Sequence, residues 1–190
     1  MYMDTKRVRG VVTANYLVDF DGGELRYDQV KIDGELYGMD GACAELKDYL
    51  GYRLDVYVKD YRDGDLKSII YYETADRNIV TVIDGGDMEG LSEGRILYRE
   101  GDKNKKLALG ANTKVVYNAS LCGNYDESII NPFVGNMDGT VTALDNNGDD
   151  ICDLVSVEAY DTYVVSDVVG NVIFNQYRPA EVVDLGGDYK

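Results

Sequence analysis

GTVTALDNNGDDICDLVSVEAY, residues 139–160, alternates apolar and polar side chains on both sides of a run of Asp, Asn and Gly. Alternation with a period of two is typical of a strand with one buried face. Asp, Asn and Gly favour turns, because their backbones adopt turn conformations at low cost and the Asp and Asn side chains bond to nearby N–H groups. The stretch therefore predicts a β-hairpin whose acidic loop covers residues 145–153.

The same alternation continues along most of the chain, in short runs bounded by clusters such as DFDGG and IDGGD. Many short strands separated by turn residues are typical of small barrels and sandwiches. We therefore expect an all-β protein of two small barrel-like or sandwich-like modules, with one short helix.

The helix is expected in DGACAELKDYLGY, residues 40–52, where the alternation breaks. Asp40 is a suitable N-cap, and Gly51 suits a left-handed C-terminal position. Ala42, Leu46, Tyr49 and Leu50 form an apolar stripe, so the pattern predicts a helix at about residues 42–50 that closes one end of a barrel.

A short repeated sequence, called the echo below, suggests that the chain has two related parts. GVVTA at residues 10–14 returns as GTVTA at 139–143, and in each case a turn and an alternating strand follow. If the echo marks related modules, the first covers residues 1–77 and the second 78–178, with a tail or connector at 179–190.

The overall charge disfavours two classes of partner. Asp and Glu number 35 against 19 Lys and Arg, which gives a formal net charge of −16. Nucleic acids and anionic lipid surfaces should be repelled by most of such a surface. The first ten residues lack the apolar centre of a signal peptide, and no stretch reaches the roughly 20 apolar residues of a membrane span. We expect neither nucleic-acid binding nor membrane insertion.

Catalysis is also not expected. The chain contains no histidine, which removes the commonest general base and the usual metalloenzyme ligand. A glycosidase-like carboxylate pair stays open as a minor alternative. Cys43, Cys122 and Cys152 show no metal-binding spacing, and free thiols are expected, with one disulfide as the alternative.

The acidic loop is a candidate calcium site. Asp145, Asn147, Asp149 and Asp153 stand at relative positions 1, 3, 5 and 9, and oxygen ligands at alternate positions can converge on a hard cation. The glycine lies at position 4 and the flanks are strands, so the match to the helical calcium motif is partial. The alternative is a turn whose side chains bond to their own backbone.

Seventeen tyrosines suggest a second kind of site. Exposed rings beside carboxylates can stack on sugars, and two groups of tyrosines are candidates: Tyr57, Tyr61, Tyr71 and Tyr72, and then Tyr160, Tyr163 and Tyr177. Tyr71 and Tyr72 must face opposite sides of one strand. Structural packing is the alternative role for these rings. Three cations at residues 5–9 would protect an exposed strand edge.

Several pieces read together resemble a known kind of protein. RGVVTAN, VKIDGELY, YLGYRLDVYVKD, the hairpin quoted above and VIFNQY occur in this order. They resemble the repeating β-rich modules of virion structural proteins of gut bacteriophages, of the tail or stabilization type. Similar modules occur in surface-layer-associated proteins of anaerobic Firmicutes.

The resemblance implies a structural role without catalysis, in a virion or at a bacterial cell surface. It implies other protein subunits as partners, in an oligomeric assembly. The hairpin lacks the second glycine of the commoner form, which weakens the case for calcium. The alternative function is that of a carbohydrate-binding or receptor-binding β module.

Overall fold

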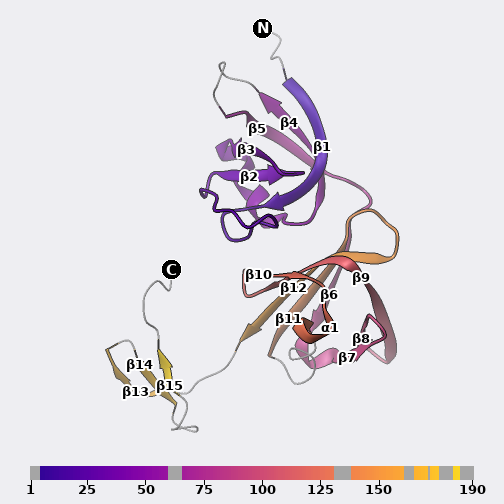
Figure 1. Ribbon diagram of the computed structural model, residues 1–190, viewed down its shortest axis with the longest axis vertical. Coiled ribbons are helices and arrows are strands. Elements are labelled where there is room, and N and C mark those ends of the chain that lie inside the picture. The colour runs from indigo at the N-terminus through magenta and orange to yellow at the C-terminus, as the bar shows by residue number, and fades with distance from the viewer. Residues whose placement is uncertain are drawn as a thin grey trace. The chain divides into compact units, whose positions relative to one another are not determined.

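The computed structural model describes residues 5–59, 66–130, 138–160, 165–170, 172–175 and 182–184 (Figure 1). The chain divides into two compact units, Met1–Ala159 and Tyr160–Lys190. The described elements are nearly all strands, which confirms the all-β prediction. None of the helices in the described ranges has the length and apolar character needed to cross a membrane.

The first part of the larger unit is a closed five-stranded barrel. Its strands are β1 (Thr5–Ala14), β2 (Gln29–Ile32), β3 (Glu35–Met39), β4 (Arg53–Lys59) and β5 (Ser68–Thr74), in the order β1-β2-β3-β5-β4. Antiparallel pairing of β1 with β4 closes the barrel, and β3 runs parallel to β5. Alternate residues point inward, so Val12, Ile32 and Val56 are buried in the core.

The cations of β1 lie where the strand has one neighbour. Residues 5–9 pair with β4, whereas the pairing of β1 with β2 begins at Val12, so protection of a strand edge by these cations stays a prediction. Arg7 and Arg9 face outward and form ion pairs with Asp55 of β4. Their role is electrostatic pairing across two adjacent strands.

The predicted helix is present, with a different type and different bounds. Element η1 (Gly41–Asp48) is a 3-10 helix. A 3-10 helix aligns residues three apart, so Cys43 and Leu46 are buried in the barrel core while Ala42 is exposed. The Asp40 side chain makes no capping hydrogen bond; its backbone carbonyl accepts from the Cys43 N–H instead. Gly51 has the predicted left-handed backbone, with φ +82°.

A second, strongly curved sheet completes the larger unit. It contains β6 (Ile79–Asp84), β7 (Met88–Ser92), β8 (Arg95–Glu100), β9 (Lys103–Tyr117), β10 (Ser120–Asn124), β11 (Asp138–Asp145) and β12 (Ile151–Tyr160), with the short helices η2 (Gly85–Asp87) and α1 (Glu127–Ile130). The order is β6-β11-β12-β9-β8-β7, and β10 pairs with β9. β11 and β12 are neighbours joined by the acidic loop, as the hairpin prediction requires.

The barrel and the second sheet share a small core. Val18, in the segment between β1 and β2, packs with Val116, Leu144 and Leu154 of the second sheet, and all four residues are buried. The predicted boundary between residues 77 and 78 lies in the connection from β5 to β6, although both sheets belong to one compact unit. The bounds 1–77, 78–178 and 179–190 stay predictions for independently folding modules.

The smaller unit contains a three-stranded sheet. Its strands are β13 (Val165–Val169), β14 (Val172–Asn175) and β15 (Val182–Asp184), in that order. Every residue of β13 is exposed, including Val165, Val168 and Val169. β13 is therefore an edge strand with exposed apolar side chains.

Candidate functional site

The acidic loop is organised around the buried carboxylate of Asp145. Its Oδ1 accepts hydrogen bonds from the backbone N–H groups of Asn147 (3.0 Å) and Gly148 (2.6 Å), and its Oδ2 accepts from Asp150 (2.9 Å). Burial opposes the ionisation of Asp145, but these N–H groups outweigh it and lower the pKa of the carboxyl. The charge of Asp145 thus fixes the turn.

The other predicted ligands bond within the loop as well. Asp153 Oδ2 accepts from the Asn146 N–H (2.8 Å) and from the Asn147 side-chain amide (3.4 Å), and Asp149 Oδ1 accepts from the Ile151 N–H (3.0 Å). Burial and the charge of Asp145 raise the pKa of Asp153. Among the described residues, no three His, Cys, Asp or Glu side chains are grouped to hold a metal ion. Calcium binding by Asp145, Asn147, Asp149 and Asp153 stays a prediction.

Asn146 gives the loop a role that no sequence pattern indicates. This buried side chain donates from Nδ2 to the carbonyl of Gly51 (2.9 Å), next to the barrel strand β4. The Asn146 backbone carbonyl accepts from Arg53 Nε at 3.2 Å, and its side-chain oxygen lies 3.5 Å from Arg53 Nη2. The loop therefore holds the barrel and the second sheet together. Local periodicity cannot predict this, since the partners are 95 and 93 positions apart.

Next to this contact lies a pocket of about 820 Å³. Ten residues from β1, β4, β5, the β5 to β6 connection and the acidic loop line it: Arg7, Arg9, Arg53, Asp55, Glu73, Thr74, Ala75, Asp76, Arg77 and Asn147. Four arginines thus face three carboxylates, in a chain whose net charge is −16. The local charge is opposite in sign to that of the whole chain.

Asp55 is the buried charge of the pocket. Its carboxylate is 8% exposed and accepts from Arg9 through two bonds (2.9 and 2.7 Å) and from Arg7 through one (2.7 Å). Hydrogen bonds from Arg9 and Arg7 hold the pKa of Asp55 well below its ordinary value of 3.8. One carboxylate thus neutralises only half of the positive charge of its two partners.

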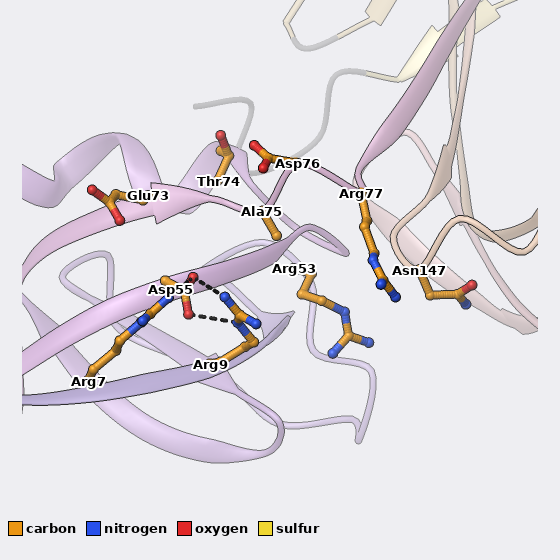
Figure 2. Close-up of a pocket in the computed structure, with 10 residues that line it drawn as sticks. All are labelled: Arg7, Arg9, Arg53, Asp55, Glu73, Thr74, Ala75, Asp76, Arg77 and Asn147. Atoms are coloured by element: carbon orange, nitrogen blue, oxygen red, sulfur yellow. Dashed lines mark hydrogen bonds and ion pairs between the residues drawn. The ribbon is translucent and has the colours of Figure 1, made fainter.

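Arg53 and Arg77 form no direct ion pair in the described part of the chain, although the charge of Arg53 acts on the nearby Asp153 carboxylate. In Figure 2 both guanidinium groups point to the same side of the β5 to β6 connection as Asn147. The carboxylates of Glu73 and Asp76 point away from them in the same view. The pocket therefore presents cationic hydrogen-bond donors that are not engaged in a direct ion pair.

The tyrosine predictions have mixed outcomes. Tyr71 is exposed and pairs with the Tyr57 ring at a centroid distance of 5.6 Å, whereas Tyr72 is half-buried and packs against the barrel core. Tyr71 and Tyr72 thus face opposite sides, as predicted. Tyr160 is exposed. Tyr61, Tyr163 and Tyr177 lie outside the described residues.

The cysteines are free thiols, as expected. Burial raises the pKa of the Cys43 thiol, with a contribution from Asp40, and burial raises that of Cys152 to about 11, with contributions from Asp145 and Asp153. A thiol needs a lowered pKa to act as a nucleophile near neutral pH. Cys43 and Cys152 are therefore packing residues.

Comparison with known proteins finds no matching family model, no matching curated protein and no matching solved structure. The resemblance to virion and surface-layer modules thus stays a prediction that rests on the sequence pieces quoted above. A fold alone does not define a function. Function must be argued from the surfaces and the pocket of this chain.

Proposed function

We propose that this chain is a non-enzymatic structural module of a large extracellular assembly, in a phage virion or at a bacterial cell surface. Its partners are other protein subunits, and it associates with them through strand edges. This role matches the sequence resemblance and the strand-rich fold.

Apolar side chains at two sheet edges carry the proposal. β6 is an outermost strand of its sheet and exposes Ile79, Val80 and Val82, the last at 65%. β13 is one of the two outermost strands of the small sheet, and Val169 is 61% exposed. Soluble proteins usually protect such edges with charges or prolines, because an unpaired strand edge is a template for another chain. These edges suit pairing with a neighbouring subunit.

The chemistry of the chain supports the non-catalytic part of the proposal. The sequence has no histidine. The buried Asp145 and Asp55 carboxylates are occupied by N–H donors, and the thiols of Cys43 and Cys152 have raised pKa values. General acid or base catalysis needs a group that is free to exchange its proton with a substrate.

Sedimentation velocity tests the proposal. We expect the wild-type chain to self-associate at concentrations of tens of micromolar, and more strongly at high salt, because salt screens the repulsion between chains of charge −16. The double variant Val82→Lys, Val168→Lys places a charge on each edge and should weaken association by about tenfold or more.

The matched control is the double variant Leu17→Lys, Ile151→Lys. Both positions expose an apolar side chain, and neither lies on an outermost strand. The control should associate as the wild type does. A wild-type chain that stays monomeric at every concentration and salt level would contradict self-association through these edges, as would equal losses in both double variants.

A further inference from the structure

The arginine pocket differs in charge from the surface around it. Its lining has four guanidinium groups and three carboxylates, so its formal charge is +1, whereas the whole chain carries −16. Its volume of about 820 Å³ lies within the range of small-molecule sites. A local excess of cationic donors in an acidic protein favours a small anion over a long polyanion, because the rest of the surface repels the polymer.

One side of the pocket is partly neutralised. Asp55 accepts all three hydrogen bonds that tie it to Arg7 and Arg9. This ion-pair group links β1 to β4 on their outer face. It also leaves the remaining N–H groups of Arg7 and Arg9 free to contact solvent or a ligand, since both side chains are half exposed.

The other side carries two guanidinium groups that form no direct ion pair among the described residues. Arg53 is held by neutral acceptors of Asn146, which fix its position without cancelling its charge. Arg77 makes no hydrogen bond or ion pair with the residues that the structure describes. Two guanidinium groups on one side of the pocket (Figure 2) repel each other unless an anion lies between them. A planar carboxylate suits this position, because arginine binds carboxylates through paired N–H bonds.

The rest of the lining suits hydroxyl groups. The Asn147 side chain comes from the acidic loop and lies on the side of Arg53 and Arg77, whereas the side chains of Thr74 and Asp76 point away from them (Figure 2). Asn147 donates and accepts hydrogen bonds, and the free N–H groups of Arg7 and Arg9 donate them. On the same face of the barrel, Tyr57 lies opposite Arg7 and the exposed Tyr71 lies opposite Tyr57, which places an aromatic pair next to the pocket.

We propose that this pocket binds an acidic sugar, with the sugar carboxylate held by Arg53 and Arg77 and the hydroxyl groups held by Asn147 and by the free N–H groups of Arg7 and Arg9. A uronic or sialic acid unit of a glycan combines these groups in one small ligand. The site adds a recognition function to a structural module and does not depend on the strand-edge proposal.

Nuclear magnetic resonance of the ¹⁵N-labelled full chain tests the inference. D-glucuronate and N-acetylneuraminate are the probes, and the arginine Nε–Hε signals are the readout. We expect saturable shifts of the Arg53 and Arg77 signals, with a Kd of about 1 mM, a usual strength for a single small ligand with few contacts. D-glucose, which lacks the carboxylate, should bind at least about tenfold more weakly.

Variants locate the site. Arg77→Gln removes a cationic donor at an exposed position and should weaken glucuronate binding by about tenfold or more with no change in melting temperature. Arg99→Gln is the matched control, because it removes the same charge from an exposed arginine of β8 outside the pocket. It should bind glucuronate as the wild type does.

Each other outcome overturns a defined part of the inference. Absence of saturable binding of both acidic sugars overturns the site. Equal binding of glucose overturns recognition of the carboxylate, and equal binding of inorganic sulfate replaces the sugar with a simple anion. Equal losses in Arg77→Gln and Arg99→Gln show that only the overall charge matters, which also overturns the pocket.

Discussion

At the scale of single residues, the buried carboxylates of this acidic chain serve to shape the backbone or to pair cations. Asp145 fixes the hairpin loop, and Asp55 joins β1 to β4. Asp19 forms a third such contact with Lys31 at 2.6 Å and also accepts from the Asp21 N–H. A buried carboxylate is tolerated only when such donors replace its lost hydration. In this chain, clusters of acidic residues in turns are therefore explained first by the hydrogen bonds and ion pairs that hold the fold, before any catalytic or metal-binding role.

Asp55→Asn should lower the free energy of unfolding by about 1 to 2 kcal/mol at pH 7, because two exposed arginines lose a charged acceptor. The Asp55 pKa is lowered in the folded state, so its stabilisation is complete above the ordinary value of 3.8 and decreases as the pH falls below it. The difference in free energy of unfolding between the wild type and Asp55→Asn should therefore shrink as the pH falls. Urea unfolding of both proteins at several pH values between 3 and 7 measures this difference.

The control for this prediction is Asp28→Asn, at an ion pair with Arg26 in which both side chains are more than half exposed. Exposed pairs contribute little to stability, so this variant should differ from the wild type by a few tenths of a kcal/mol. A difference between wild type and Asp55→Asn that is independent of pH would show that the Asp55 charge is not the cause.

At the scale of elements, the sequence pattern predicts what local forces determine. Alternation and turn residues predict the strands of the barrel and the 145–153 hairpin, because one buried face imposes a period of two. The same reasoning predicts a helix in this region, but the helix spans Gly41–Asp48 instead of 42–50 and is a 3-10 helix instead of an α-helix. The buried residues Cys43 and Leu46 are three apart, whereas the apolar stripe through Ala42 and Leu46 has the four-residue spacing of an α-helix.

The echo of GVVTA in GTVTA has a physical basis in close packing. Val12 and Val141 are buried, as are Ala14 and Ala143. Both copies also begin with a glycine that leaves no room for a side chain. A Cβ at Gly10 would meet side-chain atoms of Asp33 and Ile32 at 2.5 Å, whereas one at Gly139 would lie 1.9 Å from the backbone oxygen of Glu158.

Gly139→Ala should therefore destabilise the chain more than Gly10→Ala. Side chains near Gly10 can adjust, and we expect a cost of about 1 to 3 kcal/mol for overpacking. At Gly139 the clash is with backbone, and φ is +144°, so strain adds to overpacking and the cost should reach about 3 kcal/mol or more. Urea unfolding of the two variants gives the comparison, and equal costs would contradict it.

At the scale of the whole molecule, the decisive contacts join residues far apart in the sequence. β9 pairs with β12 in parallel, Asn146 bonds to Gly51, and Arg53 bonds to Asn146. Periodicity carries no information about which distant element becomes a neighbour, so neither these contacts nor the arginine pocket could be predicted. The net charge and the lack of histidine are properties of composition alone, and they still limit the classes of function.

The shared core predicts how the larger unit unfolds. Because Leu144 and Leu154 of the second sheet pack with Val18, the barrel and the sheet should unfold together, with equal calorimetric and van't Hoff enthalpies for the main transition. Leu144→Ala removes buried surface from this shared core and should cost about 2 to 5 kcal/mol. It should also separate the transition into two, because the contacts that couple the two parts are then weakened.

The control for this variant lies in the barrel core, away from the shared cluster. Ile69→Ala should cost a similar free energy of unfolding and alter the coupling less, since Ile69 belongs to the barrel core cluster and not to the shared core. Scanning calorimetry distinguishes the cases. A single transition with equal enthalpies in Leu144→Ala would show that the hydrogen bonds of Asn146 and Arg53 suffice to couple the two sheets.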